Sequence, residues 1–213
     1  MGMFLRRGAV SAGKKLGVID VGTMIKLNES GSPVEFYIAK HDYESGLNGT
    51  GRTLIVRKDC YDSRAFSRSY NAYANSSLDS WLCNTYLKLL DADIQSAIGT
   101  TKFYYTPGSG NYTVTTLQRA MFQLSITELG ESASYAKTEG SALPIARTLQ
   151  IAYRNGSAVD QWTRTPRTNY SDYACYLDAN GNVGYNYCGK SYGSRPAFTL
   201  PSDFIITDDM LTA

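Results

Sequence analysis

Residues Thr168 to Tyr192 read TNYSDYACYLDANGNVGYNYCGKSY, a composition that departs from the regular apolar–polar alternation of an ordinary hairpin. Six of these 25 residues are Tyr, four are Asn, three Gly, two Ser and two Asp. Only Leu177 and Val183 are aliphatic residues larger than alanine. Residues 178–182, DANGN, are typical of a turn. The stretch therefore predicts a tyrosine-rich hairpin or loop.

Two interpretations of this stretch stay open. Loops rich in Tyr, Ser, Gly and Asn are typical of recognition surfaces, because Tyr offers a large contact area at little entropic cost and the others form adaptable hydrogen bonds. Alternatively, the tyrosines of a twisted hairpin simply cover a core. The first interpretation predicts these ligand-binding residues: Thr168, Asn169, Tyr170, Ser171, Asp172, Tyr173, Tyr185, Asn186, Tyr187, Lys190 and Tyr192.

The N-terminal part of the chain predicts strands. Residues 34–39 (VEFYIA) and 53–57 (TLIVR) are rich in β-branched and aromatic residues, and the second segment is apolar enough for the centre of a sheet. A turn cluster at residues 46–51 (GLNGTG) separates them. Residues 34–57 therefore predict a β-hairpin, preceded by a loosely alternating segment at residues 21–27 and a turn at residues 28–33.

Between Ser77 and Ile98 the spacing of apolar residues changes. They recur mostly every three or four positions, as in an amphipathic helix. Asp91 divides this segment into two short predicted helices, at residues 78–89 and 92–98. Ser77 is the predicted cap of the first helix, and Gly99 is predicted to end the second.

The middle of the chain is less regular. Residues 103–105 predict a short strand before a turn at residues 107–111. Residues 120–129 predict a strand that leads into a loop, and residues 131–143 an irregular surface loop. Strands and short helices mixed in this way predict an α+β fold.

Composition excludes several classes of protein. With 213 residues the chain suits one domain with its own core. A formal net charge of +2 is too small to argue for nucleic acid, and no run of eighteen apolar residues predicts a membrane span. One His and widely spaced Cys residues match no zinc motif. We therefore expect no metal and no cofactor.

The first fifteen residues contain four basic residues and no acidic one, whereas the rest of the chain has 17 basic and 19 acidic residues. The apolar run of a signal peptide is missing after Arg6 and Arg7. We therefore expect synthesis in a reducing cytoplasm, and we divide the chain into a basic arm at residues 1–16 and a folded domain at residues 17–213. The arm is either a plain disordered terminus or a segment that docks on another chain.

Three blocks near the C-terminal end resemble a known family. They are WTRTP at residues 162–166, YLDANGNVGYNYC at residues 176–188 and YGSRPAFTLP at residues 192–201. Together they resemble a domain family of unknown function from phages and prophages of gut Firmicutes. The N-terminal MFLRRGAVSAGKKLG is similar to the start of small phage structural proteins that carry this domain.

The resemblance implies a C-type-lectin-like domain, similar to those of formylglycine-generating enzymes and of phage receptor-binding tip proteins. In variable members of that group, a diversity-generating retroelement rewrites adenines, so that Asn codons become Tyr, Ser, Asp or Gly codons. The composition of residues 168–192 resembles the product of such rewriting. The resemblance thus favours a ligand-binding face on a C-terminal tyrosine-rich hairpin.

Other features argue against catalysis. His41, the only imidazole, lies at the end of a predicted strand, where a surface or half-buried residue is expected. The segment starting at Asp178 resembles a calcium loop but has Gly189 where the bidentate Glu belongs, so we interpret it as a turn. The oxidase relatives of the fold use a cysteine pair, but no matching motif surrounds Cys175 and Cys188. We therefore do not expect an enzyme.

Four residues of these blocks are interpreted as framework: Trp162, Arg164, Arg195 and Pro196. Arg195 is expected under the hairpin, donating to backbone carbonyls, because its five N–H groups suit that task. Direct contact between Arg195 and a ligand is the alternative. If the hairpin turns between Gly181 and Asn182, then Cys175 and Cys188 face each other, as a disulfide or as two free thiols.

The expected function is adhesion. We expect a phage virion protein at a tail tip, fibre or capsid surface that binds a host-surface glycan or protein and assembles as a homo-oligomer, with a trimer favoured. Its basic arm is expected to contact other virion proteins. The alternative is a purely structural decoration protein whose tyrosine-rich face is buried between subunits. An outward, solvated face favours adhesion.

Overall fold

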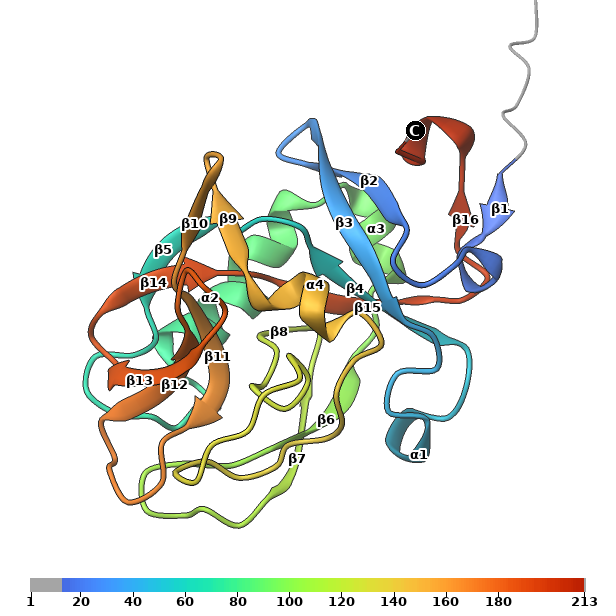
Figure 1. Ribbon diagram of the computed structural model, residues 1–213. Helices are drawn as coiled ribbons and strands as arrows, with labels where there is room; N and C mark the ends of the chain where they lie inside the picture. Colours follow the sequence, from blue (N-terminus) through green and yellow to red (C-terminus); the bar gives the residue numbers. More distant parts are fainter. Residues whose placement is uncertain (1–12, 213) are drawn as a thin grey trace, which may run out of the picture.

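The computed structural model describes residues 13–212 and contains two five-stranded sheets (Figure 1). The first sheet has the order β2–β3–β4–β15–β8, with bounds Met24–Glu29, Ser32–Lys40, Arg52–Arg57, Ala197–Pro201 and Met121–Phe122. The second has the order β13–β12–β11–β14–β5, with bounds Val183–Tyr187, Tyr173–Leu177, Gln161–Pro166, Ser191–Ser194 and Asp62–Ala65.

Three two-stranded ribbons and several short helices complete the described chain. The ribbons are β1 (Lys14–Lys15) with β16 (Ile205–Ile206), β6 (Thr101–Tyr105) with β7 (Thr115–Arg119), and β9 (Ala152–Arg154) with β10 (Ser157–Val159). The α-helices are α1 (Ser45–Asn48), α2 (Ser77–Asn84), α3 (Ala92–Ala97) and α4 (Ala146–Gln150). The 3₁₀ helices are η1 (Leu16–Val18), η2 (Tyr86–Leu89) and η3 (Asp208–Met210). The protein is therefore α+β and mostly β, which confirms the predicted class.

The predicted N-terminal hairpin is confirmed. Strands β3 and β4 pair antiparallel, with Ile38 opposite Ile55, and β2 pairs with β3 across the predicted turn. Residues 53–56 are all buried because β4 lies at the centre of its sheet. The connection between β3 and β4 is longer than a turn, since it contains α1.

The two predicted helices exist, with corrected ends. Ser76, and not Ser77, caps α2, because the Ser76 side chain accepts a hydrogen bond from the Asp79 N–H. Helix α2 ends at Asn84 and continues as the 3₁₀ helix η2. Helix α3 ends before Gly99, with Ile98 at its C-terminal boundary.

The middle of the chain differs most from the prediction. Strand β7 was not predicted, and of residues 120–129 only Met121 and Phe122 form a strand, β8. Residues 131–143 are irregular as predicted, yet this loop is not purely a surface loop. Its Glu139 is fully buried, and its carboxylate accepts hydrogen bonds from the Thr106 N–H and the Thr165 hydroxyl, which compensate for the loss of water.

The two sheets are joined by Arg195 and Pro196, which connect the end of β14 to the start of β15. Phe36 and Phe198 of the first sheet belong to the same buried apolar cluster as Trp162 of the second. One core therefore serves both sheets, and it holds the second sheet at a fixed place relative to the first.

The folded domain begins before residue 17, where the predicted basic arm was expected to end. Lys14 and Lys15 form β1, and Leu16 is fully buried with its N–H donating to the Phe204 carbonyl at 2.8 Å. Residues 13–16 are therefore part of the folded domain. The predicted docking of the arm concerns residues 1–12, which lie outside the described range. Among the described residues, no helix is long and apolar enough to cross a membrane.

Candidate functional site

The register of the β12–β13 hairpin decides which tyrosines share a face. Tyr173 is opposite Tyr187, and Cys175 is opposite Tyr185. Directly opposed residues of an antiparallel pair point to the same face, and successive residues alternate. Tyr173, Tyr185 and Tyr187 therefore lie on one face of the hairpin, and Tyr176 lies on the other.

Five rings form a connected group on the first face, which we call the tyrosine face: Tyr135, Tyr170, Tyr173, Tyr185 and Tyr187. The ring centres of Tyr135 and Tyr185 are 4.8 Å apart, and Tyr173 contacts three of the other rings at 5.8 to 6.5 Å. These contacts are edge-to-face, the arrangement that aromatic pairs prefer. Tyr170, Tyr185 and Tyr187 remain 49%, 40% and 38% exposed.

A cation lies within the tyrosine face. The guanidinium carbon of Arg167 is 3.6 Å from the ring centre of Tyr170 and 4.0 Å from that of Tyr185. A third ring, Tyr173, is 5.9 Å away. Contacts between a guanidinium and aromatic ring faces are attractive at these distances. Arg167 therefore holds the two most exposed rings in a defined relative position.

The loop that carries Tyr170 is anchored from elsewhere in the chain. The side-chain amide nitrogen of buried Asn71 is within 3.0 Å of the carbonyl oxygens of Arg167, Tyr170 and Tyr173. The Asn71 N–H donates to the Ser171 carbonyl at 2.7 Å. Residues 167–173 are thus held through their backbone groups, while the side chains of residues 169–171 are exposed.

Two of the predicted binding residues lie on the opposite face. Tyr192 packs against Trp162 at 4.7 Å and against Tyr176 at 4.6 Å between ring centres. Asn186 donates a hydrogen bond to the Tyr192 hydroxyl at 2.6 Å. The prediction that Tyr192 and Asn186 share a surface with Tyr187 is wrong, because the alternation of strand β13 separates residues 186 and 187.

The remaining predicted binding residues border the tyrosine face. Asn169, Ser171 and Lys190 are exposed, whereas Thr168 and Asp172 are half-buried. The hydrogen-bond donors of Thr168 are used within the protein, since its backbone N–H and its hydroxyl both donate to the Tyr135 carbonyl.

The framework residues are all buried. The Trp162 indole N–H donates to the Arg64 carbonyl at 3.0 Å, and the Pro196 carbonyl accepts from the Arg57 N–H at 3.0 Å. Arg195 donates to three backbone carbonyls, those of Arg57, Lys58 and Leu149. These acceptors lie at the junction of the two sheets, so Arg195 does not sit under the tyrosine-rich hairpin as predicted.

Arg164 is the centre of a buried polar network. Its guanidinium donates to the Glu128 carboxylate at 2.6 Å and lies 3.8 Å from the Glu139 carboxylate. The Tyr43 hydroxyl donates to the same Glu128. Burial raises the pKa of Glu139, and the nearby Arg164 opposes that shift. The two carboxylates in turn raise the pKa of the Arg164 guanidinium against the effect of burial, which keeps it charged.

Cys175 and Cys188 do not face each other as predicted, and of the two alternatives left open the free thiols are observed. All four, Cys60, Cys83, Cys175 and Cys188, are free. In the β12–β13 hairpin, Leu177 is opposite Val183 and Cys175 is opposite Tyr185. The residue opposite Cys175 is therefore three positions before the predicted Cys188. Burial raises the pKa of the Cys188 thiol to about 12, so it is protonated at neutral pH.

The interpretation of the DANGN segment as a turn is confirmed. The Asp178 carboxylate accepts hydrogen bonds from the N–H groups of Asn180 and Asn182, each at 2.9 Å. These bonds lower the pKa of Asp178. Gly181 adopts φ +85°, a conformation that favours glycine.

His41 is half-buried, in the type of position that the sequence predicted. Its Nδ1 is 2.9 Å from the Thr53 hydroxyl, and its Nε2 is 2.9 Å from the Ile19 carbonyl. Within residues 13–212, no three His, Cys, Asp or Glu side chains are grouped closely enough to hold a metal ion.

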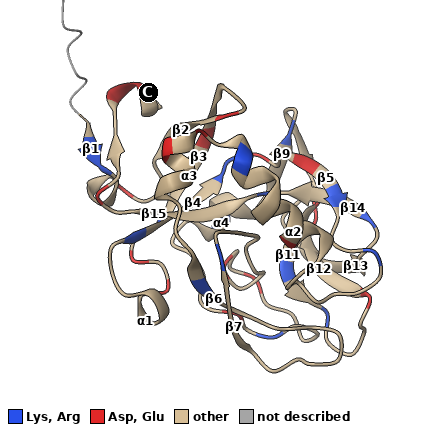
Figure 2. Cartoon of the chain, turned by 180° about the vertical axis from the view of Figure 1, so that it is seen from behind, with Lys and Arg blue, Asp and Glu red and all other residues tan. Residues whose placement is uncertain are grey.

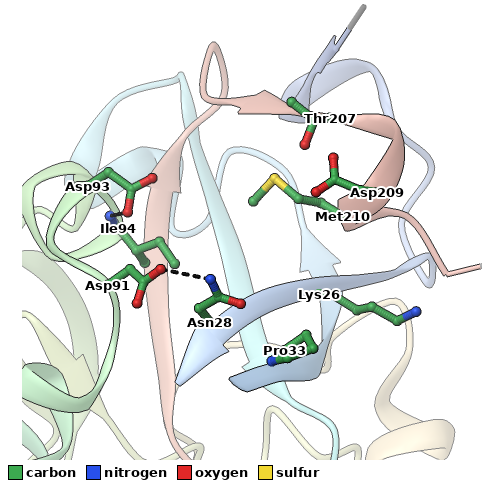
Figure 3. A pocket seen from close by; sticks show the side chains of 9 residues that line it. All are labelled: Lys26, Asn28, Pro33, Asp91, Asp93, Ile94, Thr207, Asp209 and Met210. Atoms are coloured by element: carbon green, nitrogen blue, oxygen red, sulfur yellow. Dashed lines mark hydrogen bonds between the residues drawn. The ribbon is translucent and has the colours of Figure 1, made fainter. Parts of the chain in front are cut away.

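A separate cavity of about 240 Å³ lies beside η3, far from the tyrosine face (Figure 3). Asp91, Asp93 and Asp209 are among its lining side chains, together with Lys26 and Asn28. One hydrogen bond crosses it, from the Asn28 amide to the Asp91 carboxylate at 2.8 Å. Nothing in this cavity points to a ligand beyond a group of acidic residues.

A family model described as "Domain of unknown function (DUF6273)" matches residues 50–202. The chain belongs to the DUF6273 family. The matched region contains Asn71, Arg167 and the whole tyrosine face. Comparison with curated proteins and with solved structures returned no match. The expectation of a family of unknown function is therefore confirmed.

The sequence analysis of this DUF6273 domain missed Asn71, Tyr135 and Arg167. Arg167 directly follows the WTRTP block, so a basic residue beside a tyrosine-rich stretch was an available signal. No local signal marks Asn71 or Tyr135, because their contacts with the stretch are made across long sequence separations.

Proposed function

We propose that this protein is an adhesin that binds a glycan or protein on the surface of a host cell through the tyrosine face. The observation that carries the proposal is the exposure of Tyr170, Tyr185 and Tyr187 on a fixed backbone: Asn71 holds the loop of Tyr170, and pairing with β12 holds Tyr185 and Tyr187. Rings that are fixed before binding lose little conformational entropy on binding, which is how tyrosine-rich paratopes gain affinity.

The position of the face supports the same proposal. The β12–β13 hairpin lies on the opposite side of the molecule from β1, where the described chain begins (Figures 1 and 2). A protein attached through its N-terminal arm would thus present the tyrosine face outward. We propose that the carrier is a phage virion, at a tail tip, fibre or capsid surface; this part rests on the resemblance of the sequence blocks alone.

We also propose a C-type-lectin-like fold and diversification of the tyrosine-rich stretch by a retroelement. The α+β architecture with short helices and a C-terminal hairpin is compatible with that fold. The exposed positions 170, 171, 185 and 187 are Tyr or Ser, residue types that the proposed rewriting would produce, and exposed position 169 is Asn, the residue type whose codons it would rewrite.

Attachment of the purified, fluorescently labelled protein to a panel of gut Firmicutes cells tests this function. Tyr185→Ala and Tyr187→Ala are each expected to lower the affinity by about 1–2 kcal/mol, which is roughly 5- to 30-fold. Tyr153→Ala is the matched control, because Tyr153 is 45% exposed on β9, outside the tyrosine face. Equal losses in all three variants, or none, would argue against adhesion through this face.

Tyrosine nitration of assembled particles distinguishes the structural alternative. An adhesin leaves Tyr170, Tyr185 and Tyr187 reactive in the particle. A decoration protein with this face between subunits would protect the three tyrosines on assembly and expose them on dissociation.

A further inference from the structure

Arg167 is half-buried, yet it has no acidic partner among residues 13–212. Four other arginines with largely covered side chains form ion pairs: Arg57 with Glu29, Arg64 with Asp62, Arg119 with Asp79, and Arg164 with Glu128. Arg167 instead sits between the rings of Tyr170 and Tyr185. Its environment therefore fixes the guanidinium in place without neutralising its charge.

The side-chain N–H groups of Arg167 also make no hydrogen bond within residues 13–212. Its Nε is buried and has no acceptor among these residues. Neither terminal amino group makes a hydrogen bond with the described residues. Neither is a buried atom without a hydrogen-bond partner, so both reach solvent. A guanidinium presents its N–H groups as a planar fork that matches a carboxylate or a phosphate. Arg167 thus presents oriented N–H groups that can donate to an anion at the tyrosine face.

The charges around the face favour an anion as well. Arg68 and Lys190 are exposed beside Tyr187, whose hydroxyl donates to the Arg68 carbonyl and whose carbonyl accepts from the Lys190 N–H. Asp172 is the nearby acid, and it is not within ion-pair distance of Arg167. Basic segments are prominent on the loops around β11–β14 in Figure 2.

We propose that the tyrosine face binds an acidic glycan, whose carboxylate or phosphate accepts hydrogen bonds from the terminal amino groups of Arg167. The sugar rings next to that acid pack against Tyr170 and Tyr185, because aromatic rings supply apolar area together with a polar hydroxyl. This inference rests on the proposed adhesin function and narrows its ligand class.

Oligogalacturonate and its methyl ester are the matched probes, since they share the same sugar chain and differ in charge. Isothermal titration is expected to show binding of oligogalacturonate at least about tenfold tighter than binding of the ester. Poly(glycerol phosphate) is the phosphate arm, and tighter binding of either polymer identifies which acid is preferred. Equal affinity for both galacturonate forms with no binding of the phosphate polymer, or no binding of any probe, overturns the proposal.

Three variants test whether Arg167 is responsible for the binding of the acidic probes. Arg167→Met removes the charge but keeps an unbranched side chain between the rings, and it is expected to lower affinity for the acidic probe at least about tenfold. Arg167→Lys is expected to retain part of the affinity, because it keeps the charge but not the fork. Arg147→Met, which removes an exposed arginine on α4, is expected to change nothing. Unchanged binding by Arg167→Met overturns the proposal.

The proposed adhesin function does not depend on the ligand being acidic, so the two proposals can fail separately. If Tyr185→Ala abolishes attachment to cells while Arg167→Met attaches normally, the face is an adhesive surface for a ligand that is not acidic. If neither variant affects attachment, the adhesin function itself fails. Circular dichroism of Arg167→Met, compared with the parent protein, checks that its loop and sheet are intact.

Discussion

The side-chain amide nitrogen of Asn71 lies 2.7 Å from the carbonyl oxygen of Tyr170, 99 residues later in the chain. The Oδ1 atom of the same side chain accepts a hydrogen bond from the Ser109 N–H at 2.7 Å. One buried asparagine therefore ties the turn between β6 and β7 to the loop that presents the tyrosine face. The shape of the candidate site depends on a residue that does not belong to it.

Asn71→Ala is expected to destabilise the protein by about 2 kcal/mol or more. The change leaves the carbonyls of Arg167 and Tyr170 without the donor that Asn71 provides, and buried groups without partners are costly. Urea unfolding measures the loss, with Ser171→Ala as an exposed control on the same loop. A stability equal to that of the control would mean that water replaces the amide.

Tyr192→Ala is expected to lower thermal stability, whereas Tyr187→Ala is expected to leave it nearly unchanged. Tyr192 fills the space between Trp162 and Tyr176, so its removal costs on the order of 3 kcal/mol, while Tyr187 is 38% exposed. Differential scanning calorimetry of both variants separates the two faces. A larger loss in Tyr187→Ala would contradict the observed register.

Arg164→Met is expected to cost about 3–5 kcal/mol, because it leaves the Glu128 carboxylate buried without its positive partner. Arg147→Met removes the same group from an exposed position and is expected to stay within about 0.5 kcal/mol of the parent protein. Guanidinium unfolding of the two variants provides the measurement. If Arg164→Met proves harmless, the stability of the protein does not depend on the ion pair between Arg164 and Glu128.

The thiols are expected to be slow to react in the native protein. Burial raises the pKa of Cys60 to about 11 and that of Cys188 to about 12, so little thiolate exists at pH 8. An aromatic disulfide reagent is expected to label four thiols rapidly once the protein is denatured without reductant. Only two thiols under those conditions would demonstrate a disulfide.

Asp178 is expected to make hairpin stability depend on pH. In the folded state, hydrogen bonds from the N–H groups of Asn182 and Asn180 lower its pKa from the ordinary value of an aspartate. A lowered pKa means that the stabilisation is present above the unfolded-state pKa and is lost as the pH falls through the folded-state value. The stability difference between the parent protein and Asp178→Asn should therefore shrink from pH 6 to pH 2. A constant difference would exclude this carboxylate as the cause.

Local signals in the sequence were sufficient for much of the secondary structure. The apolar segments at residues 34–39 and 53–57 predicted a hairpin because strands of that composition pair with a neighbour and bury their side chains. The helical spacing of residues 78–98 and the Asx turn at Asp178 are equally local. These signals do not fix every boundary: Ser76 caps α2 one residue before the predicted cap, and α2 ends at Asn84, where the predicted helix continued to residue 89.

The face on which each tyrosine lies was decided by the tertiary structure. Composition identified the tyrosine-rich stretch, but the pairing of Cys175 with Tyr185 instead of Cys188 decided which side chains of β12 and β13 share a face. Tyr173 therefore lies beside Tyr185 and Tyr187, whereas Asn186 contacts Tyr192 on the other face. The anchoring by Asn71 and the placement of Arg167 between two rings depend on contacts between distant segments. Such contacts leave no periodic trace in a sequence, because they form only when packing of the common core brings the two sheets and their loops together.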